Sequence, residues 1–211
     1  MGNIYYFVPY SLSRNIGQAY NQYMELLPND EDYGVLMDGD TMFLTFDWGH
    51  HIAEVIKKLP DAGIITCYTN RIAKNRIQLY GEDSTDIIIH RALAKKLDKD
   101  FRGSYRKINQ KISGFFMAIK KKTWKEVGKF PEMPNKILDV DGLFSSKILR
   151  AGKSIYLMRG MYKLHYYRMA EGRKYKDHLR NAEDIAKKSV PRRNIKSSSR
   201  NKTNIKKRRR R

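Results

Sequence analysis

The chain has little cysteine, no long apolar run and, at its C-terminal end, no acidic residues. Cys67 is the one cysteine among 211 residues, so no disulfide can form within the chain. No stretch is long and apolar enough to span a bilayer, and the first apolar run is too short for a signal peptide. We therefore expect a soluble protein of a reducing compartment, the cytoplasm, or the host cytoplasm if the protein is viral.

The uneven distribution of charge separates a basic tail from the rest of the chain. Residues 187–211 hold 13 of the 43 lysines and arginines and none of the 22 aspartates and glutamates, which leaves 30 basic and 22 acidic residues, or +8, in residues 1–186. Residues 189–211 are also nearly free of apolar side chains and cannot bury enough surface to offset the entropy lost on ordering. We expect a folded domain over 1–188 and a disordered tail over 189–211.

The tail has three candidate partners: nucleic acid, an anionic membrane surface and an acidic protein. A solvated extension that only aids solubility is the alternative. The sequence leaves these four interpretations open.

Hydrophobic periodicity predicts an α/β fold. Short β-rich apolar runs alternate with segments whose apolar residues recur at helical spacing. This alternation is typical of a mixed, mostly parallel sheet flanked by helices on both faces. Residues 98–111 are polar and basic, and we expect a mobile loop or a short helix there. The predicted strands are 4–9, 33–37, 64–68, 112–119, 154–158 and 161–167, and the predicted helices are 15–27, 47–59, 86–97, 123–128, 138–151 and 173–188.

An acidic turn, Asp38-Gly39-Asp40, follows the predicted strand 33–37 directly. Two carboxylates one residue apart can face one site, and Gly39 lets a ligand approach the backbone. Ligands of open α/β sheets bind outside the carboxyl ends of strands, where paired carboxylates suit a hard divalent cation with phosphate oxygens as its other ligands. A solvated turn is the alternative, because Asp and Gly are ordinary turn residues.

Two later segments carry further candidates. Asp139 and Asp141 open the predicted helix 138–151, so Asp139 can cap the helix while Asp141 acts as a general base. His165 lies near the end of a predicted strand, and a lone histidine is more often structural than a ligand. It becomes a ligand candidate only if folding brings it to Asp40.

Four segments in order, VLMDGD, ISGFFMAIKKKTWKEVGKF, LDVDGLFSSKILRAGKSIYLM and LHYYR, resemble glycosyltransferase family 2 and its GT-A relatives. The resemblance covers about residues 4–168 and extends to the compact versions often encoded by bacteriophages. It implies a single GT-A, Rossmann-like domain that moves one sugar from a nucleotide-sugar donor to an acceptor hydroxyl, with inversion and with Mn²⁺ or Mg²⁺. The processive QxxRW signature is absent, which favours transfer of a single sugar. The acceptor is left open among a glycan, a protein and modified DNA.

The same resemblance assigns roles to residues. Asp141 matches the catalytic base, with Asp139 as the alternative. The segment before Asp38 is shorter than in the family, so no base-binding aspartate can be assigned. The implied metal ligands are Asp38, Asp40 and His165, and the implied donor-binding residues are Pro9, Tyr10, Asn15, Gly17, Asp38, Gly39 and Gly114.

A non-enzymatic nucleic-acid-binding protein is the competing interpretation. The net charge of +21, the basic stretch 102–111 and two aromatic residues placed for base stacking, Phe101 and Tyr105, favour it. The concentration of charge in the tail argues against it. A glycosyltransferase acting on modified DNA would combine the two.

Overall fold

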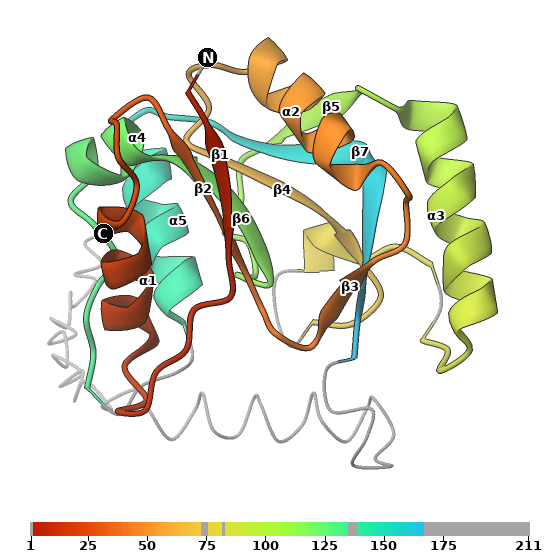
Figure 1. Ribbon diagram of the computed structural model, residues 1–211, viewed down its shortest axis with the longest axis horizontal. Coiled ribbons are helices and arrows are strands. Elements are labelled where there is room, and N and C mark those ends of the chain that lie inside the picture. Colours follow the sequence, from red (N-terminus) through yellow and green to blue (C-terminus); the bar gives the residue numbers. More distant parts are fainter. Residues whose placement is uncertain (1, 73–75, 82, 135–138, 167–211) are drawn as a thin grey trace, which may run out of the picture.

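The computed structural model describes residues 2–72, 76–81, 83–134 and 139–166, which form a seven-stranded sheet with helices on both faces (Figure 1). Within these ranges no helix has the length and apolar character needed to cross a membrane. The strands are β1 (Ile4–Phe7), β2 (Tyr33–Met37), β3 (Thr41–Phe43), β4 (Ile64–Thr69), β5 (Tyr105–Ile108), β6 (Phe116–Lys120) and β7 (Ile155–His165). The helices are α1 (Ile16–Glu25), α2 (Trp48–Lys58), α3 (Ile87–Phe101), α4 (Lys121–Glu126) and α5 (Val140–Arg150), with a 3-10 helix η1 (Arg76–Gln78).

The strands follow the order β1-β2-β6-β4-β7-β3, and β5 pairs with the first half of β7. β1, β2, β4 and β7 point in one direction, but β6 lies antiparallel between β2 and β4. Two of the six pairings between described strands are therefore parallel and four are antiparallel. The predicted mixed sheet is confirmed, whereas mostly parallel pairing is wrong. The sequence misled because β6 is buried on both faces and so has the continuous apolar run typical of a parallel strand.

Two hydrophobic cores lie on opposite faces of the sheet. Met117 and Ile119 of β6 join the core that includes residues of α1, α3 and α5. Phe116 and Ala118 of the same strand join the core that includes residues of α2. Because successive side chains of a strand point to opposite faces, this alternation places helices on both sides of the sheet. The predicted helical cover of both faces is confirmed.

The five helices predicted within the described ranges are present, and local signals account for their ends. Asn15 caps α1, since its Oδ1 accepts a hydrogen bond from the Gln18 N–H at 3.2 Å. Gly152 follows α5 with a φ of 73°, the left-handed conformation that ends many helices.

Three local predictions are corrected. Residues 98–111 are not a mobile loop or short helix: α3 continues to Phe101, and β5 pairs with β7 over Tyr105–Ile108. The strand predicted over 112–119 begins only at Phe116. The two strands predicted at 154–158 and 161–167 are one strand, because β7 keeps a partner on at least one of its edges along most of its length.

The predicted helix 173–188, the domain boundary at residue 188 and the basic tail 189–211 lie outside the described residues. The disorder of the tail therefore stays a prediction.

Candidate metal and catalytic site

The candidate residues gather at one edge of the sheet. β2, β4 and β7 run in the same direction, so their carboxyl ends share an edge. Asp38 follows β2, Asn70 follows β4, and His165 is the last residue of β7. The parallel strands thus place three polar side chains that are far apart in sequence where ligands of open α/β sheets bind.

Backbone contacts hold the acidic turn against both neighbouring strands. The Asp38 N–H donates to the Phe115 carbonyl at 3.1 Å, next to β6. On the other side, the Tyr166 N–H donates to the Asp40 carbonyl at 2.8 Å, next to β7. The Thr41 hydroxyl donates to the Asp38 carbonyl at 2.6 Å and closes the turn. The two carboxylates are therefore presented by a restrained turn rather than by a loose loop.

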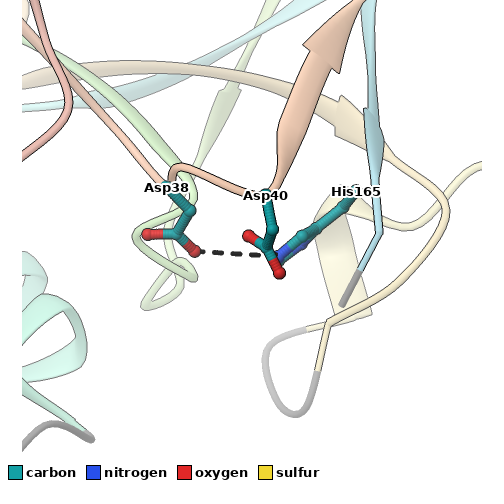
Figure 2. A group of neighbouring side chains, drawn as sticks. All are labelled: Asp38, Asp40 and His165. Carbon is teal, nitrogen blue, oxygen red and sulfur yellow. Dashed lines mark ion pairs between the residues drawn. The ribbon is translucent and has the colours of Figure 1, made fainter. Parts of the chain in front are cut away.

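The turn brings both carboxylates to His165 (Figure 2). Its Nε2 lies 3.2 Å from Asp40 Oδ1 and 3.7 Å from Asp38 Oδ2. One ligand atom from each of the three residues lies within 4.8 Å of the others. The His165 side chain is buried, and the backbone N–H of His165 donates a hydrogen bond to Asn70 Oδ1 at 2.8 Å. The condition for counting His165 as a ligand candidate, that folding brings it to Asp40, is therefore met.

His165 acts on the pKa of both carboxylates in this cluster. Burial raises the pKa of Asp38, against the lowering effect of His165. Burial also acts to raise the pKa of Asp40, but the hydrogen bond and charge of His165 outweigh it, so that pKa is lowered. The cluster therefore holds negative charge that a cation can balance.

Lys163 supplies part of the compensating charge, because its ammonium acts to lower the pKa of both Asp38 and Asp40. It lies two residues before His165 and so on the same face of β7. Its side chain is buried, with Nζ 4.6 Å from the centre of the Phe43 ring. Burial lowers the pKa of Lys163 to about 8, although Cys67, Asp38 and Asp40 act to raise it. Sequence reasoning missed Lys163, because the two-residue period of the strand places it on the face of His165 but does not show that it is buried near the two carboxylates.

The donor set fits a divalent cation. Two carboxylates and one imidazole suit Mn²⁺ and also accept Mg²⁺. The side chains of Asp38 and Asp40 are 41% and 48% exposed, so the cluster is open to a ligand from solvent. Three protein ligands leave coordination positions for phosphate oxygens or water.

Asp141 lies at the start of α5, close enough to Asp38 for the charge of Asp38 to act on the pKa of Asp141. Its Oδ2 accepts a hydrogen bond from the Gly114 N–H at 2.6 Å, and its Oδ1 accepts one from the Gly142 N–H at 2.8 Å. Burial raises the pKa of Asp141 to about 6 against these hydrogen bonds, and the charges of Asp38 and Asp139 add to the rise. A carboxylate with this pKa can exchange a proton near neutral pH.

Asp139 does not act as the predicted cap. It occupies the position before α5 but makes no side-chain capping hydrogen bond. Its φ of 77° is left-handed, whereas capping side chains project from an extended backbone. Asp139 is exposed, so its carboxylate is open to solvent.

A buried glutamine holds the segment that presents Gly114 to Asp141. The Ser113 N–H donates to Gln78 Oε1 at 2.6 Å, and Gln78 Nε2 donates to the Ser113 carbonyl at 3.2 Å. The same Nε2 donates to Thr66 Oγ1 at 2.7 Å. Sequence reasoning missed Gln78, because it lies in an irregular segment without a motif.

The residues predicted to bind the donor lie in three places: beside the acidic turn, against Asp141, and at the start of α1. Pro9 and Tyr10 follow β1, and a Cβ placed on Gly39 would lie 3.2 Å from Val8 of the same loop, so this loop borders the acidic turn. Gly114 contacts Asp141 instead of open space: a Cβ there would lie 2.9 Å from the Asp141 Cβ.

Asn15 and Gly17 each make a contact within the protein that explains the residue type without a ligand. Asn15 Oδ1 accepts hydrogen bonds from the N–H groups of Gln18 and Met133, both at 3.2 Å. A Cβ on Gly17 would lie 2.0 Å from the Pro131 carbonyl oxygen. For both residues a contact with a donor stays a prediction.

Each of the two aromatic residues proposed for base stacking already contacts another side chain, although Tyr105 stays exposed. The Arg159 guanidinium lies 4.1 Å from the centre of the Phe101 ring, and Tyr105 packs edge-on against Tyr156 at 5.6 Å.

Comparison with known proteins adds no family: no family model and no curated protein matches the chain. The chemistry of the site therefore carries the functional argument.

Proposed function

We propose that the protein is a metal-dependent glycosyltransferase of GT-A type that moves one sugar from a nucleotide-sugar donor to an acceptor hydroxyl. The observation that carries the proposal is the cluster of Asp38, Asp40 and His165 within 4.8 Å at the carboxyl edge of the sheet, with Asp141 nearby. We place the reaction in the cytoplasm, and the acceptor is a glycan, a protein or modified DNA.

The acidic cluster would hold the donor through its diphosphate. Asp38, Asp40 and His165 are the residues that would bind Mn²⁺ or Mg²⁺. A cation held there would neutralise the negative charge that grows on the departing nucleoside diphosphate. The loop with Pro9 and Tyr10, which borders the turn, would lie against the nucleotide.

Asp141 would act as the base. Its carboxylate takes the proton of the acceptor hydroxyl while that oxygen forms a bond to the anomeric carbon and the bond to the diphosphate breaks. One displacement inverts the anomeric carbon. Hydrogen bonds from Gly114 and Gly142 fix the orientation of the carboxylate, which favours a productive approach of the acceptor.

A panel of nucleotide sugars tests the proposal through thermal stabilisation and donor hydrolysis, with and without Mn²⁺. A ligand that binds only the native state raises its stability, so the correct donor shifts the melting temperature in the presence of the ion. Transfer is expected to fall as the pH drops through about 6, because a protonated Asp141 cannot accept a proton. Asp40→Ala should abolish the Mn²⁺-dependent shift.

Asp141→Asn should abolish transfer while leaving that shift in place, and Asp139→Asn, two residues away, is its matched control. If Asp139→Asn loses transfer and Asp141→Asn keeps it, the base is misassigned. If no nucleotide sugar stabilises the wild type with either ion, the proposal of sugar transfer fails.

A further inference from the structure

A groove separates α3 from the loop between β3 and α2, and none of the three residues of the acidic cluster lines it. The groove has a volume of about 490 Å³. α3 and the segment after β3 lie on the same side of the molecule in Figure 1. Five of the residues that line the groove form what we call the α3 face: Phe46, Ile88, Arg91, Ala92 and Lys95.

The α3 face exposes large apolar side chains. Phe46 is fully exposed, and Ile88 is 63% exposed. Ile87 and Ile89, at the same end of α3, are 37% and 41% exposed. Exposed apolar side chains that line one groove mark a surface where a partner is buried.

The same face has an excess of positive charge. Ile88, Arg91 and Lys95 are spaced by three and four residues, so they lie along one side of α3. Both acidic residues of the groove, Asp47 and Asp98, form ion pairs with Arg102. Among the described residues no carboxylate lies within ion-pair distance of Arg91 or Lys95. The partner therefore needs negative charge beside an apolar phase.

We propose that the α3 face docks the protein on a bilayer that contains anionic phospholipid. Phe46 and Ile88 enter the boundary of the acyl chains, and Arg91 and Lys95 contact headgroup phosphates, as on the basic apolar helices that lie in membrane interfaces. The inference does not depend on sugar transfer.

Other occupants fit the α3 face less well. Nucleic acid bases can stack on Phe46, but nucleic acid offers no apolar phase for Ile88 and Ala92. A second copy of the chain would bring its own Arg91 and Lys95 against these positive charges. Residues 167–188 of the same chain hold seven basic and four acidic residues, so they have the same sign of charge as the face.

Vesicle binding by the full chain tests the proposal. Vesicles of phosphatidylcholine alone are compared with vesicles of equal parts phosphatidylcholine and phosphatidylglycerol, and duplex DNA is titrated in parallel. The double substitution Arg91→Glu with Lys95→Glu should weaken binding to the anionic vesicles at least about 25-fold, since each basic residue contributes about fivefold. Phe46→Ser with Ile88→Ser should weaken it to a similar extent.

Matched controls separate the α3 face from the overall charge. Lys57→Glu with Lys122→Glu changes the net charge equally at two exposed positions elsewhere, and Leu26→Ser removes another exposed apolar side chain, which is 67% exposed. Both controls should bind anionic vesicles within a few-fold of the wild type. Circular dichroism checks that every variant is folded.

Three outcomes would overturn the proposal. Equal losses in the α3 variants and the charge control would mean that net charge or the tail does the binding. A loss of DNA binding without a loss of vesicle binding would assign the face to nucleic acid. A tryptophan at position 46, from Phe46→Trp, should also be quenched by brominated acyl chains, and no quenching would exclude insertion.

Discussion

The raised pKa of Asp141 makes a prediction about stability that is independent of any substrate. A carboxyl whose pKa is about 6 in the native protein, against an ordinary value of 3.8, binds its proton more tightly in the folded chain than in the unfolded chain. Stability therefore falls as the pH rises from about 4 to about 6 and is lower by a constant amount above that window. The full shift corresponds to about 3 kcal/mol, and partial exposure of the side chain lowers our expectation to about 2 kcal/mol.

Asp141→Asn removes this titration. Asparagine has one acceptor oxygen where the carboxylate has two, so one hydrogen bond from Gly114 or Gly142 is lost at a cost of about 1–3 kcal/mol. That cost does not depend on pH. Part of the wild type's pH-dependent loss of stability has already occurred at pH 4.5, so the difference in the free energy of unfolding between variant and wild type should move in favour of the variant by about 1 kcal/mol between pH 4.5 and pH 7.5.

Urea unfolding followed by circular dichroism, in the presence of a chelator, measures this difference. Asp139→Asn is the matched control, because it removes a carboxylate from the same helix start without touching the hydrogen bond from Gly114. A difference for Asp141→Asn that stays constant across the pH range would refute the reasoning, since Asp141 would then not be a destabilised acid of the folded state.

Two further predictions concern the supporting residues. Gln78→Met keeps the side-chain volume but removes both hydrogen bonds to Ser113, so we expect kcat to fall at least about tenfold with donor affinity unchanged, and an equal loss of donor affinity would contradict this. Gly17→Ala places a Cβ 2.0 Å from the Pro131 carbonyl oxygen, so we expect destabilisation of roughly 1–3 kcal/mol in thermal unfolding, and a wild-type melting temperature would show that Gly17 is not needed for packing.

Local sequence patterns predicted those strands, helices and turns whose bounds depend on residues only a few positions apart. The strand at 33–37 was predicted with its observed bounds, Tyr33–Met37, because its apolar run ends at a turn sequence. The start of α1 was predicted within one residue from the helical spacing of its apolar residues, and the structure shows that Asn15 caps it. Asp38 and Asp40 were candidates for the same reason, since a turn directly after a buried strand limits where its side chains can lie.

Pairing between strands far apart in sequence decided the strand order and the assembly of the site. The antiparallel placement of β6 between β2 and β4, and the course of β5 along β7, depend on hydrogen bonds between segments far apart in sequence. The approach of His165 to Asp40 required the pairing of β3 with β7, which local periodicity does not encode.

The sequence by itself determined which chemical groups are present and which short segments become strands, helices and turns, because spacing and turn residues act within a few positions. Tertiary structure alone decided that Asn70, Gln78 and Lys163 support the site, and that Asp139 does not cap α5. Those roles depend on burial and on partners brought together from distant parts of the chain, and burial also raises the pKa of Asp141.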